Sequence, residues 1–163
     1  MISAFNQLSM ENENLKLLLV GAYEKDLDPL KDLTNHIIKT NKSIIMAGPQ
    51  IDVRPYLAVS NLLVFPSYRE GFPNVVMEAG AMCLPAIVSN INGCNEIVVD
   101  GQNGVLVTPK IINELYEKMK NLYLNPNKLS DLSENSRAMI SSRFERQFVW
   151  KELLKEYKAL ENT

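Results

Sequence analysis

Continuous apolar runs alternate with segments in which apolar residues recur at helical spacing. Such runs predict buried strands, because a strand covered by helices on both faces is apolar at every position. The predicted strands cover residues 15–21, 43–48, 61–67, 85–90 and 104–109. The periodic segments between them predict helices over 28–40, with Pro29 in the first turn, 53–60 and 73–83.

This alternation predicts an α/β fold, a doubly wound Rossmann-like parallel sheet with helices on both faces. Residues 1–10 have the pattern of the tail of a helix, with no strand before them. A doubly wound domain should open with a strand, so we expect its first strand to be missing and its place in the sheet to be open. Residues 110–163 are helical in pattern, and we expect these C-terminal helices to pack on a single domain of residues 1–163. Breaks are expected at Pro126 and at Ser141–Ser142.

Composition narrows the class of protein. The chain has 163 residues, 46% of them hydrophobic, which suffices for one core. A net charge of −2 without basic clusters disfavours a nucleic-acid partner. No apolar run is long enough to span a bilayer, the first residues lack signal-peptide features, and the two cysteines are too few for a disulfide framework. We therefore expect a cytoplasmic protein with reduced thiols.

Three polar loops follow predicted strands, at residues 48–52, 66–74 and 89–96. Ligands of open parallel sheets bind beyond the carboxyl ends of the strands. These loops are therefore the candidate ligand site.

Two carboxylates mark this edge: Glu70 lies in the middle loop, and Glu78 lies in the second turn of the following helix. Eight residues of helix rise about 12 Å, an upper bound here because the first part of the span is a turn. Such a separation suits the two ends of a nucleotide-sugar better than one shared metal ion. The amino end of that helix, near Asn74 and Val75, offers backbone N–H groups to a phosphate. Gly71 allows the backbone to approach a ligand closely.

Structural interpretations of both carboxylates stay open at this point. Glu70 is also suited to capping the N–H groups of its own turn. Glu78 is also suited to the solvent side of an amphipathic helix, and Glu96 is interpreted as a structural carboxylate in a first helical turn.

The segment FPSYREGFPNVVMEAGAMCLPAIVSNINGCNEIVVDGQNGVLV resembles the nucleotide-binding half of the family-4 retaining glycosyltransferases. These enzymes have two Rossmann-like domains facing each other across a cleft, the GT-B architecture. The resemblance rests on the Glu-x7-Glu pair Glu70 and Glu78, on the run 84–89 and on the DGxNGxLV segment 100–107. The segments EGFPNVVMEA and NGCNEIV are most similar to the corresponding segments of bacterial enzymes of surface-polysaccharide synthesis.

The resemblance implies a role for each matching position. Glu78 would accept hydrogen bonds from the ribose hydroxyls, and Glu70 would be the catalytic-site carboxylate beside the donor sugar. The remaining implied donor contacts are the backbone at Gly71 and Phe72 with the sugar, the N–H groups of Asn74 and Val75 with the phosphates, and Gln50 and Ile51 with the base.

The resemblance also implies the reaction. A retaining glycosyltransferase moves a hexosyl or N-acetylhexosaminyl group from a nucleoside-diphosphate sugar, by family habit a UDP-sugar, to a glycan or lipid-linked acceptor. No cofactor and no metal are expected. The acceptor-binding half and the Arg/Lys pair that neutralises the diphosphate have no counterpart in this chain. We therefore expect it to be the donor half of a parent enzyme at the inner face of the membrane, and to be inactive alone.

Two other functions remain open. A nucleotide-sugar 2-epimerase shares the architecture, but that family has a Ser-Gly-Gly turn where this chain has SYREGFP. A non-catalytic nucleotide-sugar-binding module, or a receiver-like domain, is the second, although no predicted strand ends in a phosphoacceptor Asp. A dinucleotide oxidoreductase is disfavoured because no G-x-G-x-x-G follows a strand.

Overall fold

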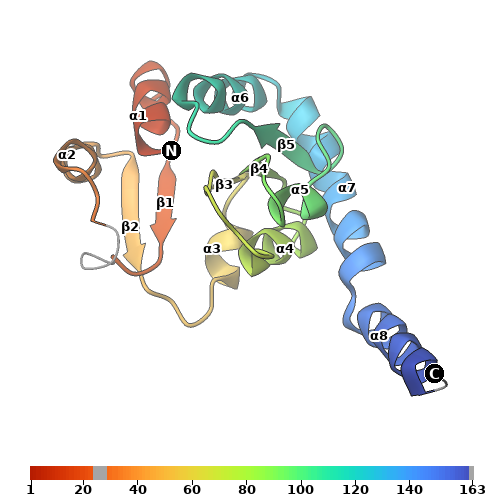
Figure 1. Ribbon diagram of the computed structural model, residues 1–163. Helices are drawn as coiled ribbons and strands as arrows, with labels where there is room; N and C mark the ends of the chain where they lie inside the picture. The colour runs from red at the N-terminus through yellow and green to blue at the C-terminus, as the bar shows by residue number, and fades with distance from the viewer. Residues whose placement is uncertain (24–28, 162–163) are drawn as a thin grey trace.

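The computed structural model describes residues 1–23 and 29–161, in which the strands form two parallel sheets. Figure 1 shows the two sheets side by side. One sheet pairs β1 (Leu17–Val20) with β2 (Ile44–Gly48), and the other has the order β3 (Leu63–Phe65), β4 (Ala86–Ser89), β5 (Gly104–Val107). Each strand lies within a segment predicted from the sequence. Between β1 and β3 the sheet is divided, so that these two strands are not paired with each other.

Helices account for most of the remaining chain. They are α1 (Ile2–Glu11), α2 (Asp32–Thr40), α3 (Arg54–Ala58), α4 (Asn74–Ala81), α5 (Cys94–Ile97), α6 (Ile112–Leu124), α7 (Pro126–Phe144) and α8 (Arg146–Glu161). Both α6 and α7 bury side chains, whereas α8 has no buried residue and projects away from the domain (Figure 1). None of the described helices has the length and apolar character needed to cross a membrane.

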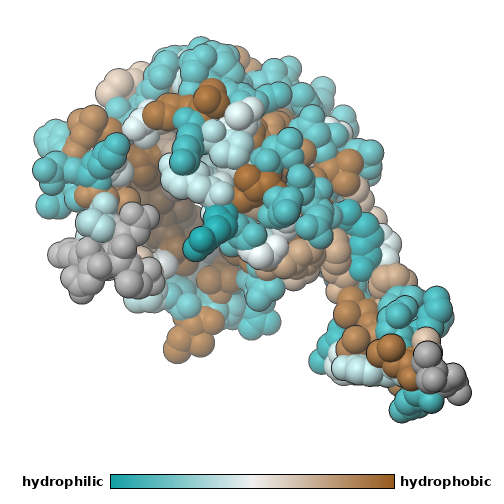
Figure 2. All heavy atoms as spheres, viewed as in Figure 1, coloured by the Kyte–Doolittle hydropathy of each residue, from teal (hydrophilic) through white to brown (hydrophobic). Residues whose placement is uncertain are grey.

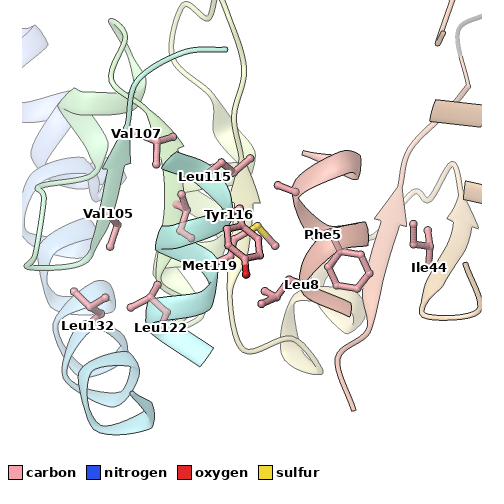
Figure 3. Close-up of a cluster of buried hydrophobic side chains, with 12 residues drawn as sticks. Phe5, Leu8, Ile44, Val105, Val107, Leu115, Tyr116, Met119, Leu122 and Leu132 are labelled. Atoms are coloured by element: carbon pink, nitrogen blue, oxygen red, sulfur yellow. The ribbon is translucent and has the colours of Figure 1, made fainter. Parts of the chain in front are cut away.

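Strand β4 shows how the helices cover both faces of a sheet. All its residues are buried, and their side chains alternate between two hydrophobic clusters. Ile87 packs in a cluster formed with α1 and α6, shown in Figure 3, whereas Ala86 and Val88 pack in a cluster formed with α4 and α5. The predicted α/β class, with a parallel sheet between helical layers, is confirmed.

Two helix starts differ from the sequence prediction. The helix predicted from residue 28, itself outside the described residues, begins at Asp32, so Pro29 precedes it. Pro73 is the N-cap of α4 and not its first helical residue: its backbone is extended (φ −74°, ψ 107°), and its carbonyl accepts a hydrogen bond from the Val76 N–H at 3.1 Å. A proline fits there because it has no N–H to leave unpaired.

The break expected at Ser141–Ser142 was predicted wrongly, whereas the break at Pro126 is confirmed. Both serines lie inside α7, where the Ser141 hydroxyl donates to the Arg137 carbonyl of the preceding turn at 2.9 Å, a contact that a serine within a helix commonly makes. The chain leaves the helix at Glu145 instead. Its carboxylate accepts hydrogen bonds from the N–H groups of Gln147 and Phe148, which starts α8.

The DGQNG turn before β5 has a structural role. The Asn103 side chain is only 3% exposed, accepts the Val99 N–H at 2.8 Å and donates to the Ile97 carbonyl at 3.1 Å. A β-carbon at Gly104 would overlap the Ala86 carbonyl oxygen, so glycine lets β5 approach β4. This part of the family resemblance therefore reflects how the sheet is built.

A polar contact between α1 and α6 joins the two sides of the molecule. The Tyr116 hydroxyl and the Lys120 ammonium donate to the Glu11 carboxylate at 2.6 and 2.8 Å. The hydrogen bonds from Lys120 and then Tyr116 lower the pKa of Glu11. Helix α1, which lies over the β1–β2 side, is thereby held against the helix that follows β5.

Candidate functional site

The loops after β3, β4 and β5 meet at one edge of the sheet. Phe65 pairs with Val88 and Ser89 with Val107, so these three strands end nearly level. The loops also touch each other. The Lys110 ammonium, after β5, lies 5.1 Å from the ring centroid of Tyr68, after β3.

Two glycine backbones bring the loops after β3 and β4 together. Gly93 has a φ of +79°, and a β-carbon there would overlap the carbonyl oxygen of Gly71. Only glycine combines this backbone angle with so close an approach. The position of Gly71, and of the residues beside it, therefore depends on the absence of a side chain at Gly93.

Glu70 is half-buried in the loop after β3 and accepts a hydrogen bond from the Ser67 hydroxyl at 2.5 Å. The partner is a side-chain hydroxyl, so the expected alternative, capping of backbone N–H groups within the turn, is not the contact that the structure shows. Ser67 holds one carboxylate oxygen and leaves the group with further acceptor sites. A ligand hydroxyl fits such a preorganised acceptor.

The negative charge of Glu70 affects the neighbouring thiol of Cys94. The thiol is buried at the start of α5, and burial, followed by the negative charge of Glu70, raises its pKa to about 11. Cys94 is therefore an uncharged thiol at neutral pH. Cys83 is exposed, and both cysteines are free.

The amino end of α4 lies between the two predicted carboxylates in the sequence. No side chain caps this end, and the N-cap Pro73 has no N–H of its own. Asn74 and Val75 are the first two residues of the helix, where N–H groups have no acceptor within the helix itself. This end also carries partial positive charge, so it is suited to an anion.

Glu78 is exposed on α4, one turn beyond this end. The opposite face of α4 packs against α7, where a β-carbon at Gly80 would come within 2.6 Å of the Ile140 side chain. Ligand binding and simple solvation of Glu78 both require an exposed carboxylate. Its exposed position is compatible with the ribose contact.

Gly71 and Phe72 complete the turn between Glu70 and α4. A β-carbon at Gly71 would have no neighbour within 4 Å, so the space beside it is open. The Phe72 ring packs edge-on against Phe144 at a centroid distance of 5.3 Å, which anchors the turn on the end of α7. The turn therefore combines a backbone held in place by Phe72 with open space beside Gly71, which suits the binding of a ligand.

Gln50 and Ile51 follow β2, on the other half-sheet. Both are exposed, and the Gln50 amide donates to the Ala47 carbonyl at 2.7 Å. The other predicted site residues, by contrast, all lie between β3 and the second turn of α4. The structure therefore groups Glu70, Gly71, Phe72, Asn74, Val75 and Glu78, whereas Gln50 and Ile51 belong to a separate loop.

Sequence reasoning missed residues that position the site, namely Ser67, Gly93 and Cys94. Ser67 and Glu70 have the Ser-x-x-Glu spacing of a local side-chain pair, which was a usable signal. Glu96 accepts the Gly93 N–H at 3.1 Å, which confirms the structural role predicted for it. No three His, Cys, Asp or Glu side chains among the described residues are grouped so as to hold a metal ion.

Comparison with known proteins places these loops in a family context. Residues 1–139 match the family model described as "Glycosyl transferases group 1". Over 157 residues the chain is 27% identical to the capsular polysaccharide biosynthesis glycosyltransferase CapM of Staphylococcus aureus, covering 96% of this chain and 41% of CapM. It is 32% identical over 103 residues to the UDP-Gal:alpha-D-GlcNAc-diphosphoundecaprenol alpha-1,3-galactosyltransferase of Escherichia coli, covering 63% of this chain and 26% of that enzyme.

Among solved structures, the fold is similar to that of Anabaena Alr3699/HepE, crystallised in complex with UDP. The TM-score is 0.86 at 24% identity, over 97% of this chain and 44% of that one. The likeness covers both half-sheets and their helices. This chain therefore spans about two fifths of the length of CapM and of the Anabaena protein.

Proposed function

Because the chain belongs to the glycosyl transferases group 1 family, we propose that its loops after β3 and β4 bind the nucleoside-diphosphate sugar of a glycosyltransferase. One observation carries the proposal. Along the sequence, the uncapped amino end of α4 lies between two carboxylates: Glu70, held by Ser67, and the exposed Glu78. A nucleotide-sugar has hydroxyls at both ends and a diphosphate between them, and this arrangement offers acceptors at both ends and donors between.

The diphosphate binds at the amino end of α4 in this proposal. The backbone N–H groups of Asn74 and Val75 donate to phosphate oxygens, and the partial positive charge of the helix end favours their negative charge. Gly71 leaves room for the sugar, because no atom lies within 4 Å of where its β-carbon would be.

The two carboxylates recognise hydroxyls. Glu78 accepts from the ribose 2′ and 3′ hydroxyls, and an ionised carboxylate has acceptor sites for both. Glu70 accepts from a hydroxyl of the donor sugar while Ser67 occupies one of its oxygens. Gln50 and Ile51 would contact the base from the other half-sheet.

The proposed reaction is a retaining transfer to a glycan or lipid-linked acceptor in polysaccharide synthesis, with UDP as the leaving group. The names of the S. aureus and E. coli relatives and the UDP complex of the Anabaena protein support this choice of donor and acceptor. The main chemical need is to stabilise charge on the departing diphosphate, and fixed N–H donors at α4 meet part of it. In this proposal the described loops bind only the donor, and the acceptor is bound by another part of the whole enzyme.

The proposal is tested by thermal shift of this chain with UDP, UDP-glucose, UDP-galactose and UDP-N-acetylglucosamine, with GDP and AMP for comparison. We expect UDP and at least one UDP-sugar to raise the melting temperature, and Glu78→Ala to abolish the rise. Glu117→Ala, which removes an exposed helical carboxylate from α6, should leave the rise unchanged. Absence of a shift with every nucleotide would overturn the proposal.

A further inference from the structure

The turn that carries Glu70 presents an aromatic ring and a cation at its tip. The Ser67 hydroxyl donates to the Glu70 carboxylate at 2.5 Å and closes the turn, and the two residues between them, Tyr68 and Arg69, are exposed. Tyr68 is 66% exposed. A second cation comes from the loop after β5, because the Lys110 ammonium lies 5.1 Å from the centroid of the Tyr68 ring. We call the side chains of Tyr68, Arg69 and Lys110 the Tyr68 cluster.

The Tyr68 cluster is separate from the large apolar cavity of the molecule. That cavity, of about 1070 Å³, lies between the two sheets, and Figure 2 shows it as a hollow with a brown, hydrophobic inner surface. Among the described residues, its walls include every residue of β1 and of β3 and none of the Tyr68 cluster. A ligand group bound by the cluster therefore lies at the sheet edge beyond β3 and β5 and not between the sheets.

Lys110 is held in a strained backbone conformation. Of the described residues other than glycine, two have a positive φ, Cys83 at 62° and Lys110 at 68°. Cys83 follows the C-cap of α4, where a left-handed residue commonly ends a helix, and its N–H donates to the Gly80 carbonyl at 3.0 Å. Lys110 precedes α6 instead, so no helix ending accounts for its φ. Glycine adopts this angle without strain, and strained residues of other types are concentrated at functional sites, which favours a role for the lysine side chain.

The two cations of the cluster have no carboxylate partner in the described part of the chain. Neither Arg69 nor Lys110 forms an ion pair there. The carboxylates nearby in sequence have other partners: Glu70 accepts from a serine hydroxyl, and Glu114 of α6 accepts the Thr108 N–H at 3.0 Å. A guanidinium and an ammonium beside an exposed aromatic ring suit an anionic group on a sugar, since the cations pair with the charge and the ring packs against the apolar face of the sugar.

The proposed function narrows the identity of this anion. In it, the diphosphate of the donor lies at the amino end of α4, and Glu70, the residue after Arg69, accepts from a hydroxyl of the donor sugar. The part of the ligand beside the cluster is therefore the donor sugar. A carboxylate on that sugar supplies a negative charge there, and its planar shape matches the paired N–H groups of a guanidinium. The single negative charge of Glu70 opposes such an anion, and the two cations offset it.

We propose that the Tyr68 cluster selects a donor sugar that carries a carboxylate, a nucleoside-diphosphate hexuronate. This inference rests on the proposed function, because it requires the donor sugar at Glu70. Arg69 and Lys110 pair with the carboxylate, and Tyr68 packs against the sugar ring. A neutral hexose makes no such ion pairs, so the cluster raises the affinity for the acidic donor over that for the neutral one.

The test compares UDP-glucuronate with UDP-glucose, which has a hydroxymethyl group in place of the carboxylate. The pair UDP-galacturonate and UDP-galactose repeats the comparison in the other C4 configuration. Titration calorimetry of the 163-residue chain measures each dissociation constant, with UDP alone as the reference. In at least one pair we expect the uronate to bind at least roughly fivefold more tightly than the hexose. Lys110→Met and Arg69→Gln should each remove most of this preference and leave the affinity for UDP unchanged.

Two controls separate selectivity from stability. Lys110→Gly removes the ammonium and relieves the backbone strain, so the preference should be lost while the melting temperature changes little. Lys151→Met, which removes an exposed cation from α8, should leave the preference unchanged. A large fall in the melting temperature of Lys110→Gly with an unchanged preference would assign Lys110 a structural role and overturn the proposal.

Binding of UDP separates this proposal from the proposed function. If UDP binds and neither uronate is preferred, the proposed function stands and the hexuronate proposal is overturned. If no nucleotide binds, the proposed function fails, and the hexuronate proposal fails with it. N-acetylglucosamine 1-phosphate, titrated into the chain saturated with UDP, tests an acceptor phosphate as the occupant. Binding that depends on Lys110, without a preference for a uronate, would also overturn the proposal.

Discussion

Gly93 lies so close to Gly71 that a β-carbon at Gly93 would occupy the space of the Gly71 carbonyl oxygen. The two residues belong to loops after different strands, β3 and β4. Their contact sets the position of the Glu70 turn relative to α5. Gly93 is needed for the contact between the two loops, whereas a β-carbon at Gly71 would have no neighbour within 4 Å. The two glycines of the candidate site therefore have different roles.

Alanine substitution should separate these roles. Gly93→Ala combines a strained φ of +79° with a backbone overlap, so we expect the free energy of unfolding to fall by more than about 2 kcal/mol. Gly71→Ala meets no atom within 4 Å and should change it by less than about 1 kcal/mol. Urea unfolding of the two variants makes the comparison. Equal destabilisation by both would show that the loop contact does not depend on Gly93.

A larger side chain at Gly71 should affect binding and spare folding. Gly71→Val places a branched side chain in the open space proposed for the donor sugar. We expect the affinity for a UDP-sugar to fall at least tenfold, and the affinity for UDP, which has no sugar, to fall less. Titration calorimetry measures both, with melting temperature as the folding control. A variant that melts far below the original chain would show that the glycine is structural.

The charge of Glu78 should be needed for nucleotide binding. Glu78→Gln keeps the shape of the side chain and removes the ionised acceptor, and hydrogen bonds to charged groups contribute about 1.5–3 kcal/mol. We expect UDP affinity to fall roughly tenfold or more, with no change for the matched α6 variant Glu117→Gln. Equal UDP affinity of Glu78→Gln and the original chain would rule out the ribose contact.

Cys94 should make stability depend on alkaline pH. Its pKa is about 11 in the folded chain against 9.0 as the ordinary value. Below about pH 9 the thiol is protonated in both states and contributes no pH dependence. Between pH 9 and 11 the unfolded chain loses this proton and the folded chain keeps it, so the free energy of unfolding should fall as pH rises.

Two variants isolate this effect. Cys94→Ala should flatten that part of the pH profile, and Glu70→Gln should lower the pKa of Cys94 because it removes the neighbouring charge. In the original chain at pH 8, a thiol reagent should modify the exposed Cys83 and reach Cys94 only after unfolding. Rapid modification of two thiols in the folded chain would contradict the burial of Cys94.

The 163-residue chain should bind a nucleotide-sugar and yet transfer no sugar from it. The residues proposed here contact the donor, and holding an acceptor beside the reacting carbon can lower a barrier by about 7–11 kcal/mol. An assay with radiolabelled UDP-sugars and lipid-phosphate acceptors measures transfer. A longer polypeptide that includes the acceptor-binding half of a group 1 relative is the positive control. Robust turnover by the short chain would contradict the two-domain interpretation.

The sequence alone determined the order of strands and helices and the segment that carries the candidate site. Every observed strand lies within a predicted run, because the apolar pattern of a buried strand is local and depends little on distant contacts. The resemblance of residues 65–107 to a glycosyltransferase likewise depended on residues close together in the chain. Helix ends were less predictable, as at Glu145, because side-chain hydrogen bonds decide them.

Only the tertiary structure decided how these pieces meet. The Gly93–Gly71 contact and the action of the Glu70 charge on Cys94 join loops after different strands, and no local pattern specifies such contacts. The structure also showed that β1 and β3, which have the sequences of central strands, face each other across a cavity. Hydrophobic pattern records which faces of a strand are to be buried, whereas the identity of its neighbours depends on how the whole chain folds.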